Sequence, residues 1–319
     1  MPVANICLLG GTGFVGRRIC AQLAKRPAKL RVLTRNAALN RDLLVIPNLE
    51  LIETNVFDPK LLRAQLSGID TVINLVGILN EKRRGDFERV HVELPRMLLA
   101  ASREAGVRRL LHMCALGAAP DAPSRYQRTK AAGEQLVLAA NGPDLAVTSF
   151  RPSVIFGPGD SLFNRFARLL ALSPLFFPLP TPNTRFRPVF VDDVARAFVV
   201  SLDNPRTFGR SYELCGPRTF TLRELVAYTA ELTHRTRTIV GLPDWASRLQ
   251  ARLLGLLPGR PYTMDNYLSA TVDNVCAQDG LAELGIEQKI DINAVVPHYL
   301  ASFTWRARYN VYRQWARRQ

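Results

Sequence analysis

Residues 10–16 read GGTGFVG, and they decide the fold because they join an apolar run to an amphipathic one. The run before them, Ile6–Leu9, has the length and composition of a buried strand. The run after them, Phe14–Lys25, carries apolar residues at helical spacing. A glycine-rich turn between a first strand and a first helix predicts a phosphate-binding loop, in which the N–H groups of the helix start face the phosphates.

Each glycine of this loop has its own expected task. Gly10 permits the tight turn, Gly13 lets the backbone approach a pyrophosphate, and Gly16 lets the helix pack close to the sheet. The alternative is a glycine-rich turn without a ligand, and the strand–turn–helix context argues against it. The loop therefore predicts a bound dinucleotide.

Outward from the loop, apolar and amphipathic runs alternate through residues 1–150. Further strands are predicted at Leu30–Leu33, Leu49–Ile52, Thr71–Val76, Arg109–Cys114 and Leu145–Phe150. Further helices are predicted at Asp58–Leu66, Phe87–Ala105 and Ser124–Ala140. Strict alternation predicts an α/β, Rossmann-type doubly wound parallel sheet with helices on both faces.

The rhythm breaks after residue 151. Proline-rich residues 171–188 predict a long irregular connection. Beyond it, strands are predicted at Val189–Val191 and Ser211–Leu214 with the helix Asp192–Leu202 between them, followed by the helix Thr221–Leu232 with a Thr221–Glu224 capping box. Residues 244–319 are predicted to be mainly helical, with interruptions at Pro258–Pro261 and Pro297. We expect residues 1–150 to form the dinucleotide-binding core, and residues 151–319 to supply the remaining sheet elements and a smaller C-terminal lobe.

The second predicted strand ends in Thr34-Arg35-Asn36, with no acid to hold a ribose 2′-hydroxyl. Arg35 can pair with a 2′-phosphate, and Arg17 or Arg41 can assist. This pattern favours NADPH over NAD, the alternative being that Arg35 is a surface arginine. Asn74–Gly77 ends the fourth predicted strand, where a small residue leaves room for the cofactor. Asn55-Val56 follows the third strand and resembles the Asp-Val step that the short-chain dehydrogenase/reductase superfamily places beside the adenine, with Asn in place of Asp.

Tyr126 and Lys130 form a Y-x-x-x-K motif whose spacing places both side chains on one helix face. The alternative is an exposed pair without function. Cys114 ends the preceding strand, where the short-chain dehydrogenase/reductase superfamily, which the glycine spacing resembles, usually has a Ser or Thr that orients a substrate carbonyl. A thiol is a weak hydrogen-bonding group, and Cys114 is otherwise a small buried hydrophobe.

The spacing G-x-x-G-x-x-G resembles that of the short-chain dehydrogenase/reductase superfamily. RPSVIFGPGD (151–160), RPVFVDDVA (187–195) and YELCGP (212–217) resemble its extended, epimerase/dehydratase-like branch over residues 4–235. INLVGILNE (73–81) and ALGAAPDAPSRYQRTKAAGE (115–134) resemble the reductase-like accessory subunit family of respiratory complex I, with relatives associated with coenzyme Q biosynthesis.

The resemblance implies catalytic roles for Tyr126 and Lys130, in which the lysine binds the nicotinamide ribose and lowers the tyrosine pKa, with Cys114 in the third position. It implies no metal site, and a structural NADPH. The implied cofactor-binding residues are Gly10, Thr12, Gly13, Phe14, Val15, Gly16, Arg35, Asn55, Val56, Val76, Gly77, Tyr126, Lys130, Arg151, Pro152 and Val154.

Three functions stay open at this point. The first is an accessory or assembly factor of the complex I or ubiquinone machinery, peripheral to a membrane. The second is an active NADPH-dependent reductase, dehydrogenase or epimerase that uses Tyr126 and Lys130 on a quinone-related or sugar-nucleotide substrate. The third is a cofactor-sensing regulator or a nucleic-acid binder on the same fold.

The charge balance is strongly basic: 42 Lys and Arg against 27 Asp and Glu give +15. Such an excess predicts an anionic partner. Residues 303–319 add five arginines and an aromatic stripe, which suit either an anionic membrane surface or the protein's own core. Nucleic acid is a weaker option than either, because no recognised binding module accompanies the charge.

The five cysteines are odd in number and lack a C-x-x-C motif, so we expect neither a disulfide framework nor a structural zinc site. The same cysteine pattern fits a protein of a reducing compartment. The sequence shows no secretory signal, and its most apolar stretch contains arginines and prolines, so no spanning helix is expected. These features predict a protein that is soluble or peripheral to a membrane. The resemblance implies the bacterial cytoplasm, peripheral to the inner membrane, or the mitochondrial matrix side if the chain is a mature eukaryotic protein.

Overall fold

The computed structural model describes residues 4–173, 175–235, 237–258 and 260–300. The predicted aromatic and arginine-rich stripe at 303–319 lies outside them. The chain divides into two compact units, each described by itself. Unit 1 comprises residues 1–152, 191–215 and 276–287, and unit 2 comprises residues 153–190, 216–275 and 288–319.

Unit 1 is built on a seven-stranded sheet in the order β11-β6-β5-β4-β1-β2-β3, and every neighbouring pair is parallel. The strands are β1 (Ala4–Leu9), β2 (Ala28–Thr34), β3 (Leu49–Glu53), β4 (Thr71–Asn74), β5 (Arg109–Met113), β6 (Ala146–Pro152) and β11 (Arg210–Leu214). The strand order reverses between β1 and β4, which creates the switch point where doubly wound folds bind ligands. The predicted Rossmann-type α/β fold is confirmed.

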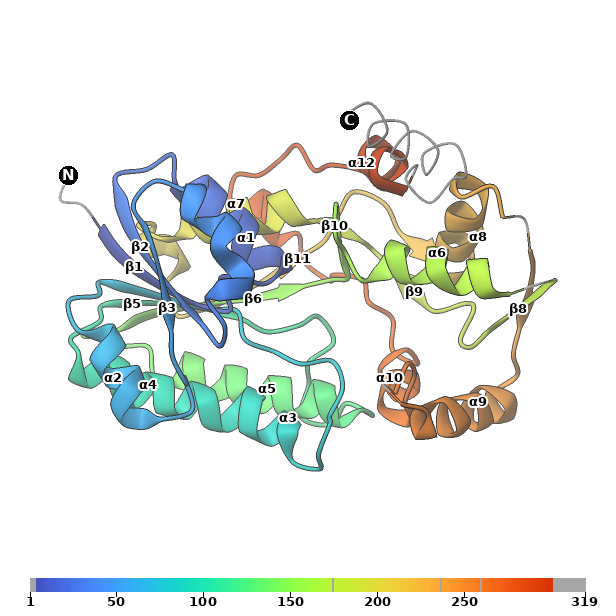
Figure 1. The fold of residues 1–319 in the computed structure, drawn as a ribbon, viewed down its shortest axis with the longest axis horizontal. Coiled ribbons are helices and arrows are strands. Elements are labelled where there is room, and N and C mark those ends of the chain that lie inside the picture. Colours follow the sequence, from blue (N-terminus) through green and yellow to red (C-terminus); the bar gives the residue numbers. More distant parts are fainter. Residues whose placement is uncertain (1–3, 174, 236, 259, 301–319) are drawn as a thin grey trace, which may run out of the picture. The chain divides into compact units, whose positions relative to one another are not determined.

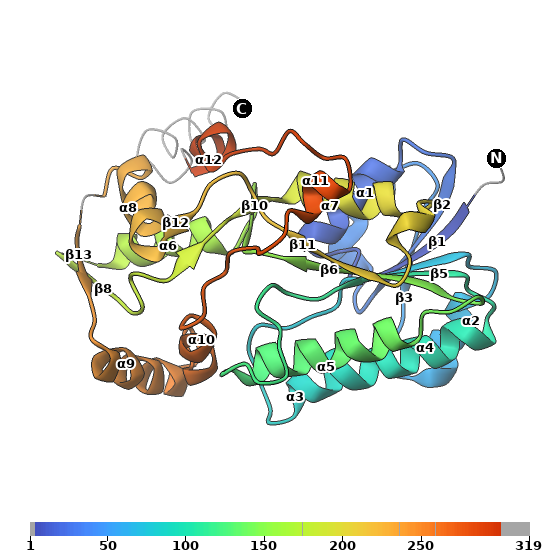
Figure 2. The same cartoon turned by 180° about the vertical axis from the view of Figure 1, so that it is seen from behind.

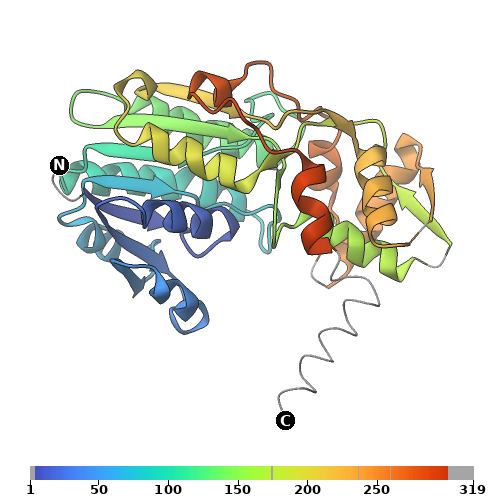
Figure 3. The same ribbon diagram turned by 90° about the horizontal axis from the view of Figure 1, so that it is seen from above.

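Helices cover both faces of this sheet (Figures 1 and 2). α1 (Phe14–Leu23) and α7 (Val191–Ser201) lie side by side on one face (Figure 3). The other face carries α2 (Pro59–Leu66), α4 (Leu94–Glu104) and α5 (Arg125–Ala139), with α3 (Asp86–Glu88) and a π-helical turn, η2 (Arg89–Glu93), ahead of α4. Shorter elements are η1 (Ala38–Val45), η3 (Pro205–Thr207) and α11 (Gly280–Glu283).

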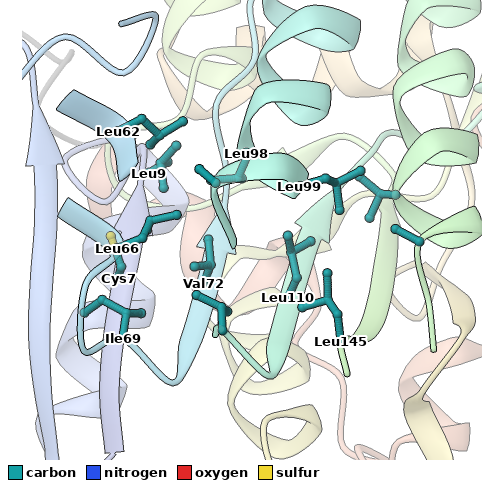
Figure 4. Packing of buried hydrophobic residues seen from close by; sticks show 14 of the residues in the cluster. Cys7, Leu9, Leu62, Leu66, Ile69, Val72, Leu98, Leu99, Leu110 and Leu145 are labelled. Atoms are coloured by element: carbon teal, nitrogen blue, oxygen red, sulfur yellow. The ribbon is translucent and has the colours of Figure 1, made fainter. Parts of the chain in front are cut away.

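The core beneath α2 and α4 shows why these runs fold together (Figure 4). Cys7, Val72 and Leu110 project from three neighbouring strands and are fully buried. Leu62 and Leu98 meet them from the two helices. Each such aliphatic side chain contributes about 1.5–3 kcal/mol when it leaves water, so the apolar spacing in the sequence holds the helices on the sheet.

Unit 2 is assembled from helices and three two-stranded sheets. Its helices are α6 (Leu162–Leu172), α8 (Leu222–Leu232), α9 (Asp244–Leu256), α10 (Met264–Ser269) and α12 (Ile292–Leu300). The strand pairs are β7 (Ile155–Phe156) with β10 (Val189–Phe190), β9 (Arg185–Phe186) with β12 (Phe220–Thr221), and β8 (Phe176–Leu179) with β13 (Thr238–Gly241). The Thr221–Glu224 capping box of α8 is present as predicted.

Two expectations for this half of the chain are wrong. Residues 171–188 contain β8 and β9, because Phe177 and Leu179 alternate into a small core beneath α6 and α8 while their neighbours stay outside. Pro297 lies inside α12 and does not interrupt it. Burial of Val296 and Leu300 on either side keeps that helix in place despite the missing N–H group.

The cysteine expectation is also corrected, because Cys215 and Cys276 form a disulfide. They are 61 residues apart in sequence, and their Cα atoms lie 6.1 Å apart. Residues 276–278 return beside β11, where the Ala277 N–H donates to Glu213 at 2.7 Å. The odd number of cysteines did not exclude a disulfide, because the other three cysteines are free and buried. Whether two cysteines pair depends on their distance in the fold, which sequence spacing does not reveal.

No helix among the described residues is long and apolar enough to cross a bilayer.

Candidate cofactor and proton-transfer site

The glycine loop has the geometry that its sequence predicts. Gly10 has a φ of +79°, and a Cβ there would lie 3.1 Å from the Leu75 carbonyl carbon. A Cβ on Gly16 would lie 2.5 Å from the Gly10 carbonyl oxygen, so only glycine allows α1 to begin this close to the loop. Gly11, which had no expected role, is equally constrained, because its Cβ would meet Val32 at 2.8 Å.

Gly13 sits at the entrance to α1 and is exposed. No side chain caps this helix start, and its first turn contains no acid. The amide groups of the following turn, from Phe14 onward, therefore carry the positive end of the helix dipole toward an open approach. A side chain at Gly13 would stand in that approach, so the loop fits a pyrophosphate.

The three arginines proposed for the adenosine end differ in their surroundings. Arg17 forms an ion pair with Asp42 and donates to Asn40 and to the Thr12 carbonyl, each at 2.9 Å. It therefore holds the glycine loop to the segment after β2. Arg35 is exposed directly after β2. Arg41 is also exposed.

The turns after β3 and β4 are fixed by their own asparagines. Asn55 accepts a hydrogen bond from the Phe57 N–H at 3.1 Å, and the half-buried Val56 packs against the core. Asn74 accepts from the Val76 N–H at 3.2 Å and contacts His112 through its amide nitrogen. These bonds set the edge of the sheet on which a dinucleotide would lie.

Gly77 and Lys130 come together at this edge. A Cβ on Gly77 would lie 3.2 Å from the Lys130 Nζ, so the small residue leaves room for the ammonium group. Lys130 is buried, and its Nζ donates to the Met113 carbonyl at 2.9 Å. Burial lowers the pKa of Lys130. One turn earlier, the half-buried Tyr126 lies in the first turn of the same helix, which begins at Arg125 and is capped by Ser124.

His91 is a site residue that the sequence analysis missed. Its Nε2 accepts from the Ile78 N–H at 3.2 Å, so the proton is on Nδ1, which donates to Thr129 at 3.0 Å. Burial, with a smaller effect from Lys130, lowers the pKa of His91 to about 2 and keeps the ring neutral. The ring also meets Tyr126 edge-on at 5.5 Å between centroids.

The π-helical turn explains how His91 reaches this position. It brings the His91 carbonyl so close to α5 that a Cβ on Gly133 would lie 1.8 Å from the carbonyl oxygen. The histidine therefore connects the Gly77–Ile78 turn to the helix that carries Tyr126 and Lys130. The available sequence signal was a histidine on the buried side of the predicted helix 87–105.

Cys114 lies beneath α5 among Ala118 and Ala131. Its thiol donates to the Lys130 carbonyl at 3.5 Å. Burial raises the pKa of Cys114 to about 12, so the sulfur stays a neutral thiol. The structure thus places this residue in the packing that supports Lys130.

Arg151, predicted as a cofactor contact, is engaged by Glu134. This buried carboxylate accepts from Arg151 Nε at 2.8 Å, from Ser149 at 2.6 Å and from Ser211 at 2.9 Å. These hydrogen bonds lower the pKa of Glu134 despite its burial, which alone would raise it. The pair ties α5 to β6 and β11 below Lys130. It is a second feature that the sequence analysis missed.

The last two expected contacts fall in different units. Pro152 ends β6 in unit 1 and accepts from the Leu116 N–H at 3.0 Å. Val154 belongs to unit 2, where its N–H donates to Asn274 at 2.9 Å. Unit 1 thus contains a glycine loop at an uncapped helix start, the buried amino group of Lys130 and the Tyr126 phenol on the same helix as that lysine. This arrangement can bind a dinucleotide and exchange a proton at the Tyr126 hydroxyl.

Comparisons with known proteins agree with this geometry. The model of the NAD dependent epimerase/dehydratase family matches residues 6–215. Rat "NADH dehydrogenase [ubiquinone] 1 alpha subcomplex subunit 9, mitochondrial" is 32% identical over 294 residues, covering 88% of this chain and 75% of that protein. A "Ceramide reductase" from Caulobacter vibrioides is 31% identical over 203 residues, covering 63% and 61%.

Among solved structures, the dTDP-glucose 4,6-dehydratase DesIV from Streptomyces venezuelae, with NAD bound, superposes with a TM-score of 0.72. Its sequence is 19% identical, and the match covers 93% of this chain and 95% of that one, so this likeness concerns the fold. The matched family residues include the glycine loop and the Tyr126–Lys130 pair. By these residues and by its sheet, the chain belongs to the NAD dependent epimerase/dehydratase family.

Proposed function

We propose that this chain holds NADP(H) as an accessory or assembly factor of the respiratory complex I or ubiquinone machinery. Its expected partners are respiratory or quinone-biosynthesis proteins. Its expected place is peripheral to a membrane, on the cytoplasmic side in a bacterium or the matrix side in a mitochondrion. The identity of about 30% to mitochondrial complex I subunits over most of the chain supports this assignment.

The placement of Cys114 is the observation that carries the proposal. A reductase of this type needs a hydroxyl that orients a substrate carbonyl. The Cys114 thiol instead donates to the Lys130 carbonyl inside the packing, and it is a weak donor. The nucleotide-binding loop meets its geometric demands, whereas the third member of the proton-transfer site is turned inward. This combination favours a dinucleotide that stays bound as a structural cofactor over one that is oxidised and exchanged in each catalytic cycle.

The residues have separate tasks toward such a cofactor. The first-turn amides of α1 hold the pyrophosphate, and Arg35 pairs with the 2′-phosphate of NADPH, which favours it over NAD. Lys130 holds the nicotinamide ribose beside Gly77. When bound, NADPH supplies a hydride. Tyr126 is the group of this chain that would hold or deliver the matching proton.

A second candidate function is an active NADPH-dependent reductase, dehydrogenase or epimerase, acting on a quinone-related or sugar-nucleotide substrate. The specific observation in its favour is the intact pair of Tyr126 and buried Lys130 on one helix. The similarity to a ceramide reductase supports the same reading.

Complementation of a strain that lacks the gene separates the two functions. The variants are Tyr126→Phe, which removes only the phenolic hydroxyl, and Gly13→Val, which obstructs the phosphate approach. The accessory function predicts that Tyr126→Phe restores complex I activity and quinone content while Gly13→Val does not. If Tyr126→Phe still binds NADPH but restores neither complex I activity nor quinone content, the result would contradict the accessory function and favour the active enzyme.

A further inference from the structure

α9 exposes its large side chains and buries its small ones, the reverse of an ordinary surface helix. Trp245 is 70% exposed, Leu253 57% and Leu256 83%. Leu249, in the same row, is 48% exposed. The fully buried positions of the helix are Ser247 and Ala251. We call the four exposed residues Trp245, Leu249, Leu253 and Leu256 the α9 stripe.

Helical geometry makes these four positions one surface. At about 100° per residue they fall within an arc of about 80°, opposite the arc that contains Ser247 and Ala251. The stripe therefore runs along the whole outer face of α9. It is a continuous apolar row, unlike the singly scattered surface leucines that need no explanation.

The orientation of α9 is fixed by its contacts with α10, beside which it lies in Figures 1 and 2. Tyr267 of α10 is buried and donates its hydroxyl proton to Asp244 at the start of α9. Near the other end, a Cβ on Gly255 would come within 3.7 Å of the Tyr262 carbonyl oxygen. Turning the stripe inward would break these contacts, so the helix is built to present it.

The charge beside the stripe is positive. Residues 235–260 contain five arginines and a single acid, Asp244. Arg248 pairs with Asp244 at 2.8 Å, and Arg252, one turn further along the same edge of the stripe, is exposed. A second copy of the chain docked on this face would bring like charges together across a two-fold axis. An anionic surface meets the arginines with opposite charge.

We propose that the α9 stripe docks on an anionic lipid surface, with Trp245 and the leucines below the headgroups and Arg248 and Arg252 at headgroup level. Apolar and aromatic residues on one face with arginines at its edge are what interfacial helices use. The inference deepens the proposed function, because it gives the membrane-side location a defined surface. The docking inference takes only the place beside a membrane from the proposed function, and it does not depend on which cofactor is bound.

Quenching of Trp245 by lipid tests the proposal directly. The three tryptophans are Trp245, Trp305 and Trp315, so the full chain carrying Trp305→Phe and Trp315→Phe reports on α9 alone. Vesicles contain phosphatidylcholine and phosphatidylglycerol at 7:3, with part of the phosphatidylcholine brominated in its acyl chains. We expect Trp245 emission to shift to the blue and to be quenched. Vesicle binding without quenching, or no vesicle binding, would overturn the proposal.

Flotation with matched variants gives a second test. Leu249→Gln with Leu253→Gln is expected to lower the vesicle partition coefficient at least about tenfold, since both leucines lose apolar burial in the lipid. Arg252→Gln is expected to lower it about fivefold on anionic vesicles and to change it little on pure phosphatidylcholine. The control, Leu44→Gln with Leu61→Gln, changes two exposed leucines of unit 1 and should leave binding unchanged.

NADPH binding separates failure of this inference from failure of the proposed function. The α9 variants are expected to bind NADPH as the original chain does. Equal vesicle binding by the α9 variants and the control would overturn the docking surface and leave the cofactor assignment standing. Loss of self-association in place of lipid binding, measured by sedimentation equilibrium, would show that a second copy covers the stripe and would also overturn it.

Discussion

Arg35 and His91 illustrate how differently single residues can be located from the sequence. Arg35 directly follows β2, a strand that the sequence reveals, so its exposed position at the end of that strand could be predicted. His91 acts through Ile78 and Thr129, which lie 13 and 38 residues away along the chain. Glu134 joins Ser211 over 77 residues. No local pattern encodes such partners, and for this reason both buried groups escaped the sequence analysis.

Replacing Arg35 tests the cofactor preference. Arg35→Ser is expected to weaken NADPH binding by roughly 10–100-fold, because a charge-assisted pair with the 2′-phosphate is lost. NADH, which lacks that phosphate, should bind equally well before and after the change. Isothermal titration with both nucleotides measures the ratio, and Arg41→Ser serves as the matched exposed arginine. An unchanged ratio for Arg35→Ser would show that this arginine does not select the cofactor.

The buried histidines predict how stability depends on pH. Burial lowers the pKa of His91 to about 2 and that of His112 to about 3, against 6.5 for an unburied imidazole. The unfolded chain therefore takes up protons first, so stability is full above pH 6.5 and falls as the pH drops toward the folded values. At pH 5 the loss is about 2 kcal/mol per histidine.

Urea unfolding at pH 7.5 and pH 5 measures this loss. His91→Gln should remove about half of the histidine contribution to the difference between the two pH values. His234→Gln, at an exposed position, should leave the difference as it is. A His91→Gln variant with the full original pH dependence would contradict a neutral, buried imidazole at this position.

At the scale of elements, the structure follows the sequence where one run of residues decides an element by itself. The alternating strands and helices of unit 1, the Gly loop and the capping box of α8 are of this kind. β8 and β9 are not, because Pro178 lies within β8, prolines flank the two-residue β9, and each strand is paired with a distant one. The π-helical turn also has no sequence signal of its own, since it forms where the His91 carbonyl packs against Gly133 of α5, 42 residues further along the chain.

The disulfide joins two elements that the sequence does not connect. Cys215 directly follows β11, and Cys276 ends the excursion of the chain into unit 2 before it returns to unit 1. Unpaired cysteines supported the expectation of a reducing compartment, so the disulfide removes that support. The proposed location is now supported by the similarity to mitochondrial complex I subunits and by the α9 stripe.

Reduction is expected to destabilise the protein. Opening a loop of 61 residues removes up to about 4 kcal/mol of stability in the chain-entropy description. Thermal unfolding with and without a phosphine reductant measures the change, and peptide mapping without reduction identifies the 215–276 link. The variant Cys215→Ser with Cys276→Ser should unfold at the same temperature in both conditions. If the unfolding temperature of the unsubstituted chain were the same with and without the reductant, the result would contradict a disulfide between Cys215 and Cys276.

In the molecule as a whole, the candidate cofactor site and the candidate docking surface belong to different units. Unit 1 holds the glycine loop, Lys130 and Tyr126, and unit 2 carries the α9 stripe. The net charge of +15 predicted an anionic partner, but only the structure shows that arginines border a solvent-facing apolar row. The sequence alone could not separate a buried stripe from an exposed one, since both have the same helical spacing.

The proposed accessory function requires that the molecule keep its dinucleotide bound. Its most direct test is the exchange of bound NADPH on the purified, full-length protein, chased with excess unlabelled NADPH and run in parallel with NADH. We predict that NADPH leaves over hours, that Tyr126→Phe leaves this rate unchanged, and that NADH binds more weakly. Release of NADPH within seconds would contradict the claim and identify the protein as a turnover enzyme of its family.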